Sequence, residues 1–219
     1  MAYHVKTFFL ICLLPQAFCS LASIIRFLDQ NYQVGQYAAA INVPAGQCDQ
    51  NFQPLNDNFL TSDPSANVRN VIMRDKDPVY KGTELIAAGV QQQPHPAHSE
   101  YLLLYPVNNS PLTYLLNKQK NACVVFYTLN SPCVNSCLNG RRYNIIQGIE
   151  KLKNYQGIKY FVFKNIWKHD QGEQNKEKLK ENLKKIADRV PLYRCRNNAC
   201  TLCGQPDSNE GINEVCLSV

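Results

Sequence analysis

Blocks of hydrophobic and polar residues along the chain predict strands separated by helices. Five runs are apolar or β-branched enough to form strands, and they lie at residues 36–43, 83–90, 122–129, 158–164 and 191–195. The runs at 122–129 and 158–164 are nearly all apolar, which is typical of strands buried on both faces. Helices are expected from about residue 97 to the proline-containing stretch 106–111, then over 112–119, 131–154 and 173–190.

The order of these elements predicts an α/β sandwich. A helix precedes a strand at 137–164 and again at 173–195, so we expect the late strands to be parallel. Residues 44–82 are rich in Asn, Asp, Gln, Pro and Ser and are expected to form a long loop, with a helix near 67–74. One folded domain over 23–195 would then be followed by a cysteine-rich tail over 196–219 that has no periodicity.

The first 22 residues have the pattern of a secretory signal peptide. A short segment with Lys6 precedes an apolar run at 8–14, and small residues follow, so cleavage is expected after Cys19 or after Ala22. The run is too short for a membrane anchor, and the alternative is a buried N-terminal helix. The mature protein is therefore expected to be secreted, without a membrane anchor.

Secretion changes how the ten cysteines are interpreted. Two would leave with the leader, and an even number in an oxidising compartment normally indicates disulfides. The eight that remain are Cys48, Cys123, Cys133, Cys137, Cys195, Cys200, Cys203 and Cys216. Any metal site must therefore be weighed against a fully disulfide-bonded chain.

Composition and charge set broad limits on function. The hydrophobic fraction is 45%, which excludes a mainly disordered chain. The net charge is +6, or +5 once Lys6 is removed, a mild excess compatible with a polyanionic partner. Most lysines of the 173–190 helix are expected on its solvated face, with a nucleic-acid role as the alternative.

Four residues form a pattern that points to chemistry. His98 and Glu100 lie at the start of one predicted helix, and Cys133 and Cys137 lie one turn apart at the start of another, after Ser131 and Pro132. A catalytic zinc takes three protein ligands and keeps a fourth position open, and helix N-termini stabilise thiolates. The alternative for the two cysteines is a disulfide with each other.

This H-x-E…P-C arrangement resembles the zinc-dependent nucleobase deaminases, and it is most like the secreted AID/APOBEC-like deaminases of vertebrates. The cysteine spacing is C-x₃-C rather than C-x₂-C. The resemblance covers about residues 36–195. It implies a cytidine deaminase-like fold, a three-layer α/β/α sandwich with a mixed five-stranded sheet.

The resemblance also implies roles for individual residues. His98, Cys133 and Cys137 would bind one Zn²⁺, and Glu100 would be the catalytic proton carrier. Ser131 would contact the substrate. Trp167 and Lys168, which both follow the fourth strand, would contact it as well. Trp167 could instead only cap the core. The six other cysteines would form three disulfides of open pairing, and a second zinc site at Cys200 and Cys203 is the alternative for two of them.

The implied reaction is hydrolytic deamination of cytosine to uracil, and the motif alone does not exclude adenine. Single-stranded DNA or RNA is the expected substrate, because Arg141 and Arg142 lie near the metal-binding helix and Trp167 lies beside Lys168. Asn130 stands where many nucleic-acid mutators of the family carry Trp, which counts against this. Two alternatives are a deaminase of free nucleosides, and an inactive, disulfide-rich binding protein that retains structural zinc.

Overall fold

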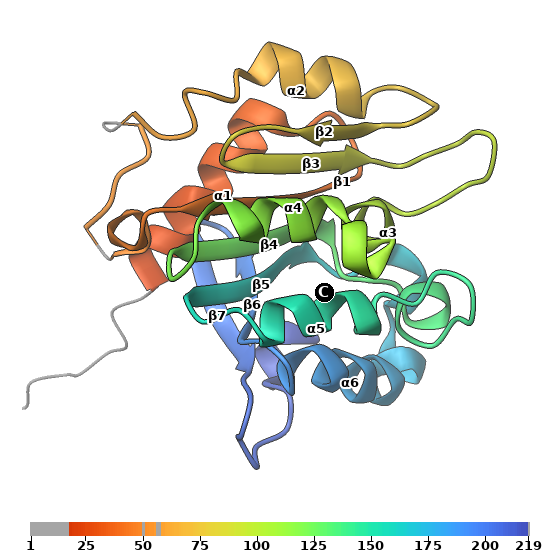
Figure 1. Ribbon diagram of the computed structural model, residues 1–219. Helices are drawn as coiled ribbons and strands as arrows, with labels where there is room; N and C mark the ends of the chain where they lie inside the picture. The colour runs from red at the N-terminus through yellow and green to blue at the C-terminus, as the bar shows by residue number, and fades with distance from the viewer. Residues whose placement is uncertain (1–17, 50, 56–57, 219) are drawn as a thin grey trace, which may run out of the picture.

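The computed structural model describes residues 18–49, 51–55 and 58–218. Its α-helices and strands alternate for most of the chain (Figure 1). They are α1 (Phe18–Tyr32), β1 (Tyr37–Val43), α2 (Ser65–Ile72), β2 (Val79–Lys81), β3 (Leu85–Gly89), α3 (Ser99–Leu104), α4 (Pro111–Lys118), β4 (Cys123–Asn130), α5 (Ile146–Lys153), β5 (Ile158–Asn165), α6 (Glu173–Ala187), β6 (Leu192–Arg196) and β7 (Ala199–Gly204). Short helical turns are η1 (Ala45–Cys48), η2 (Val107–Asn109), the π-helical turn η3 (Val134–Leu138), η4 (Lys168–Asp170) and η5 (Glu214–Cys216).

The described strands form one mixed sheet of seven, in the order β2-β3-β1-β4-β5-β6-β7. β4, β5 and β6 are parallel to one another, which confirms the prediction for the late strands. All other pairs are antiparallel. The carboxyl ends of β4, β5 and β6 therefore meet at one end of the sheet, where the loops after β4 and β5 lie close together.

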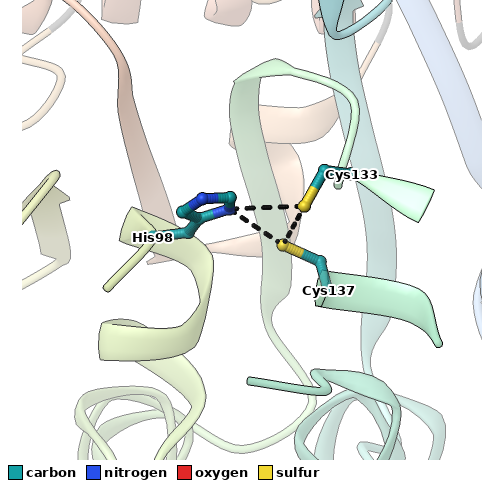
Figure 2. Close-up of side chains that lie close together, drawn as sticks. All are labelled: His98, Cys133 and Cys137. Carbon is teal, nitrogen blue, oxygen red and sulfur yellow. Dashed lines mark hydrogen bonds between the residues drawn. The ribbon is translucent and has the colours of Figure 1, made fainter. Parts of the chain in front are cut away.

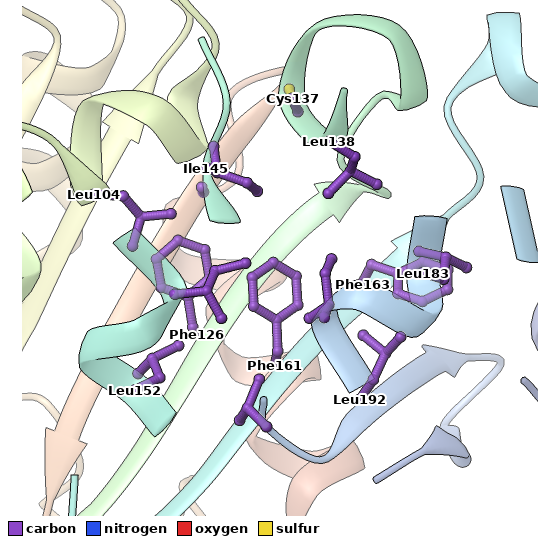
Figure 3. Packing of buried hydrophobic residues seen from close by; sticks show 14 of the residues in the cluster. Leu104, Phe126, Cys137, Leu138, Ile145, Leu152, Phe161, Phe163, Leu183 and Leu192 are labelled. Atoms are coloured by element: carbon purple, nitrogen blue, oxygen red, sulfur yellow. The ribbon is translucent and has the colours of Figure 1, made fainter. Parts of the chain in front are cut away.

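Alternating side chains of the central strands fill two separate cores. Along β4, Val124 and Phe126 join the core beneath α3, α4, α5 and α6, whereas Val125 and Tyr127 join the core beneath α1 and α2. Figure 3 shows Phe126 of β4 and Phe161 of β5 side by side in the first core, with their rings stacked 5.0 Å apart. Helices thus cover both faces of the sheet, as the expected three-layer arrangement requires.

The five predicted strands are all present, but the prediction of a five-stranded sheet is wrong. The first added strand, β2, lies inside the expected loop 44–82 and pairs with β3 at one edge. The second, β7, lies in the tail that was expected to lack periodicity, and it pairs with β6 at the other edge. Both are edge strands with partly exposed residues, so neither has the apolar run that marks a buried strand.

The single helix predicted over 131–154 is also wrong. The chain instead forms the turn η3, then an irregular segment, and then α5. The break is stabilised by a hydrogen bond from the Ile145 amide to the Cys137 carbonyl, at 2.8 Å, and by one from the Asn144 side chain to the Leu138 carbonyl. These bonds use carbonyls that a continuous helix would have paired within itself.

Three disulfides join the six cysteines that the expected mature chain has outside the predicted metal site, as expected in number. The pairs are Cys48–Cys123, Cys195–Cys200 and Cys203–Cys216. Cys200 and Cys203 are both in disulfides, which argues against a second zinc site there.

The predicted leader 1–22 lies mostly outside the described residues, and α1 begins at Phe18. Within α1, Ser20 is buried, and its hydroxyl donates a hydrogen bond to the Cys48 carbonyl at 2.9 Å. In the part of the chain that the structure describes, no helix has both the length and the apolar character that a bilayer crossing needs.

Candidate active site

Three predicted metal ligands come from two segments at the carboxyl end of the central strands. His98 is the residue that precedes α3, and its backbone is still extended. Cys133 precedes η3 in the same way, and Cys137 lies within that turn. The amides of Cys137 and Leu138 both donate to the Cys133 carbonyl, at 3.0 and 3.2 Å, so the turn closes between the two cysteines. The Ser131 amide donates to the Asn165 carbonyl at 2.7 Å, which fixes the approach to the turn.

The donor atoms of these residues converge (Figure 2). His98 Nδ1 lies 3.1 Å from Cys137 Sγ and 3.5 Å from Cys133 Sγ, and the two sulfurs are 3.1 Å apart. Zinc binds His nitrogen and Cys sulfur at about 2.0–2.3 Å, so three donors around one ion lie about 3–4 Å from each other. Cys133 and Cys137 are both free cysteines, which argues against a disulfide between them. The donor set therefore fits zinc.

The two cysteine side chains differ in the direction of their pKa shifts. Hydrogen bonds from Cys137, His98 and Ser136 lower the pKa of Cys133 to about 3, even though burial opposes this. The pKa of Cys137 is raised, first by its hydrogen bond to Cys133 and then by burial. The hydrogen bond with Cys133 also raises the pKa of His98, against the effect of its burial. Cysteine binds a metal ion as the thiolate, so metal binding displaces the thiol proton. A cysteine whose pKa is already lowered loses that proton easily.

Glu100 lies beside this centre without joining it. It is 2% exposed, and its Oε1 accepts a hydrogen bond of 2.7 Å from the Thr128 hydroxyl on β4. Its Oε2 has a longer contact of 3.3 Å with the Ser99 hydroxyl. Burial raises the pKa of Glu100, and the Thr128 hydrogen bond partly opposes that rise. A carboxyl group whose pKa is moved towards neutrality is suited to proton transfer.

A cavity of about 120 Å³ joins these groups. Its walls include His98, Cys133 and Glu100, so two of the candidate metal ligands and the buried carboxyl group face the same space. The complete lining is Gln36, Val90, His98, Glu100, Asn130, Ser131, Cys133 and Trp167. Drug-sized ligands occupy pockets of about 300–1,000 Å³, so this space is suited to one small ring.

The structure places the three predicted substrate residues differently. Trp167 and Ser131 line the cavity, but the Ser131 hydroxyl already accepts a hydrogen bond from the Trp167 amide at 3.0 Å. The Trp167 ring centre is 6.3 Å from that of His98. Lys168 does not line the cavity, and its Nζ lies 5.9 Å from the centre of the Trp167 ring. Arg141 and Arg142 are also absent from the cavity wall.

Sequence reasoning missed three residues that support the site. Thr128 binds Glu100, and the Gln36 side chain accepts a hydrogen bond from Asn130 across the cavity wall, at 2.5 Å. Asp170, which follows β5, accepts a hydrogen bond from the Val134 amide at 2.9 Å and so caps η3 from 36 residues away. No local pattern in the sequence marks these long-range partners.

Fold and site together define a mixed α/β protein with a His/Cys/Cys group that could hold a metal ion and an adjacent buried glutamate. A family model described as Secreted Novel AID/APOBEC-like Deaminase 1 matches residues 19–218. This chain belongs to that family, because the match covers most of its length. No curated protein and no solved structure matches the chain.

Proposed function

We propose that the protein is a secreted, zinc-dependent hydrolytic deaminase that converts cytosine to uracil, with single-stranded nucleic acid as its substrate. The observation that carries this proposal is the shared cavity, where Glu100 faces the same space as His98 and Cys133. Family membership supports deamination, and the three disulfides support passage through an oxidising compartment.

In the proposed reaction, different residues hold the metal ion and support its ligands. Zinc, when bound, supplies a Lewis acid that lowers the pKa of water towards neutrality. His98, Cys133 and Cys137 would hold it, and Asp170 would keep η3 in place. In the overall reaction the oxygen of water becomes bonded to C4 of cytosine, the C4–N4 bond breaks, and ammonia leaves.

Glu100 carries the protons in this scheme. It takes one proton from the attacking water and delivers it to ring N3. It then takes the remaining proton from the new C4 hydroxyl and passes it to the departing amino group, which leaves a C4 carbonyl and ammonia. Thr128 holds Oε1 at 2.7 Å, so Oε2, with its longer contact to Ser99, is the oxygen freer to exchange a proton. Burial excludes competing water from the carboxyl group.

The size of the cavity favours a base presented on a strand. At about 120 Å³ the cavity is smaller than the pockets that enclose a whole drug-sized ligand, so we expect the base to enter it. Sugar and phosphate must then lie outside, where a polynucleotide gains contacts that a free nucleoside lacks. Trp167 lines the cavity and is partly exposed, so its ring is placed to stack on a base.

A paired assay tests the substrate. Zinc-loaded protein is incubated with equal concentrations of cytidine, adenosine and a cytosine-containing oligonucleotide, at low and at physiological salt, and the products are measured by mass spectrometry. We expect the oligonucleotide to be deaminated fastest, with an advantage that falls as salt rises. Faster conversion of cytidine than of the oligonucleotide at both salt concentrations would indicate a deaminase of free nucleosides. Product from adenosine alone would show that the choice of cytosine as the base is wrong.

Trp167→Ala is the informative variant, with Tyr114→Ala as its control. Both rings have a lysine amine over them, since Lys118 Nζ lies 4.4 Å from the Tyr114 ring centre, but Tyr114 is an exposed residue of α4 outside the cavity. Loss of base stacking should weaken oligonucleotide binding by about 1–3 kcal/mol for Trp167→Ala. Equal effects of the two substitutions would show that the Trp167 ring does not stack on substrate.

A further inference from the structure

A second hollow beside the ligand turn is lined by cations and has no acidic residue in its wall. Its volume is about 540 Å³, and Arg141, Arg142 and Lys185 contribute the charge. The remaining lining residues are Tyr105, Leu138, Gly140, Asn144, Ile146 and Gln147. Arg141 and Arg142 come from the segment between η3 and α5, which faces α3 and α6 in Figure 1.

The positive charge in this hollow is not neutralised within the described part of the chain. Arg141 has no hydrogen-bond or ion-pair partner there, and Arg142 contacts only the Tyr143 ring, 5.2 Å from its centre. Lys185 donates to the side-chain oxygens of Asn139 and Asn182, which are uncharged. Like charges brought together without counter-ions favour an anionic ligand.

Two carboxylates near the hollow have cationic partners of their own. Glu150 on α5 binds Arg189 at 2.6 Å, and Asp188 at the end of α6 binds Lys184 at 2.7 Å. They are therefore poorly placed to neutralise the arginines.

Aromatic rings adjoin the cations. Tyr101 of α3 and Tyr105, which directly follows α3, are stacked with their ring centres 4.5 Å apart, and Tyr143 meets Tyr101 edge-on at 5.1 Å. All three are partly exposed. Phosphate-binding cations beside rings that can stack on bases are the combination that single-stranded nucleic acids require. A sulfated glycan would use the cations but has no aromatic face to stack on the tyrosines.

The hollow is close enough to the candidate active site to share one strand with it. α3 begins directly after His98 and ends before Tyr105, and its six residues span about 9 Å at 1.5 Å per residue. A stacked strand advances about 3.4 Å per nucleotide, so a few nucleotides are enough to cover the length of α3.

We propose that this hollow binds the backbone phosphates of a single-stranded polynucleotide, within a few nucleotides of the base that enters the catalytic cavity. Arg141 and Arg142 are its principal phosphate ligands, and Tyr143 is its stacking residue. The choice of a polynucleotide rests on the proposed function, whereas the anion site itself rests on the cations and the hollow.

Binding is measured by fluorescence anisotropy with a labelled single-stranded oligonucleotide, using the full mature protein over a range of salt. The double substitution Arg141→Ala/Arg142→Ala is compared with Arg74→Ala/Lys76→Ala. The control removes the same charge from two exposed residues that follow α2, near the opposite edge of the sheet. Equal melting temperatures of the two double variants establish that both remain folded.

Each phosphate contact on a single strand contributes about 0.7 to the slope of log K against log salt, so losing two should reduce the slope by about 1.4. At 50 mM salt, affinity should fall on the order of tens-fold, whereas the control keeps most of its binding. Equal losses in both double variants, or no binding by the unmodified protein, would overturn the inference.

Tyr143→Leu and a heparin fragment distinguish the two polyanions. We expect Tyr143→Leu to weaken oligonucleotide binding several-fold and to leave heparin binding unchanged. If the arginine variant lost heparin and oligonucleotide equally and Tyr143→Leu affected neither, the hollow would be a sulfated-glycan site and the proposal would be wrong. Because binding is measured without turnover, a protein that deaminates nothing yet shows the expected arginine effect refutes the proposed function alone.

Discussion

Replacing Asp170 by Ala should weaken zinc binding even though Asp170 is not a ligand. Its side chain accepts the hydrogen bond of the Val134 amide, the residue that directly follows Cys133. Asp170 is 6% exposed and Val134 is 2% exposed, so water cannot readily replace the lost acceptor. The amide at the start of η3 would remain without a partner, and the position of Cys133 would be less restricted.

The size of the effect follows from these contacts. An unpaired buried amide costs about 1–3 kcal/mol. Removal of a group that orients a metal ligand typically lowers metal affinity about 10–100-fold, which is about 1.4–2.7 kcal/mol. The two free-energy ranges overlap, so we expect the zinc dissociation constant of Asp170→Ala to rise by about 10–100-fold. Asp170→Asn keeps an acceptor oxygen and should have a smaller effect.

Competition with a chromophoric chelator measures the zinc dissociation constant of each variant. Asp63→Ala is the control, because Asp63 is also buried and accepts hydrogen bonds from Tyr80, Thr83 and Glu84 at 2.9–3.0 Å, away from the candidate metal site. It should lower the melting temperature and leave zinc affinity unchanged. An Asp170→Ala protein with the zinc affinity of the unmodified protein would refute the reasoning.

Two further predictions concern the metal ligands and the N-terminus. Cys137→Ser and His98→Ala should each abolish the one equivalent of zinc that we expect to co-purify, as measured by elemental analysis of non-reduced protein. Zinc retained at full occupancy in either variant, or a metal-free protein with a disulfide between Cys133 and Cys137, would exclude the site. Secreted protein should begin at Ser20, because cleavage after Ala22 would remove the hydrogen bond from Ser20 to Cys48; N-terminal sequencing that finds Ser23 would contradict this.

The central part of the fold could be predicted because its signals are local. β4 and the middle of β5 are apolar runs, and the face of α6 that carries Leu179, Leu183 and Ile186 repeats with helical spacing. The two edge strands of the sheet could not be predicted from local patterns. β2 has only three residues, and β7 depends on its pairing with β6 and on the Cys195–Cys200 disulfide.

In the candidate site, as in the fold, the features that could be predicted are those with a signal in the local sequence. The order of His98, Glu100, Cys133 and Cys137 along the chain was sufficient to predict three converging ligands with a glutamate beside them, and the donor atoms do converge. Supporting contacts come from residues distant in sequence, such as Thr128 on Glu100 and Asp170 on η3. Such partners are defined only by the packing of β4 and β5, and the break between η3 and α5 likewise depends on tertiary hydrogen bonds.

The most direct test of the account compares zinc-loaded Glu100→Gln with the unmodified protein in one deamination assay. Glutamine has the shape of glutamate and can still accept from Thr128, but it cannot carry a proton. We therefore expect zinc content and melting temperature to stay the same, and conversion of cytosine to uracil in a single-stranded oligonucleotide to fall by about 10²–10⁴-fold. If Glu100→Gln released uracil as fast as the unmodified protein, Glu100 would not be the proton carrier and the proposed chemistry would be wrong.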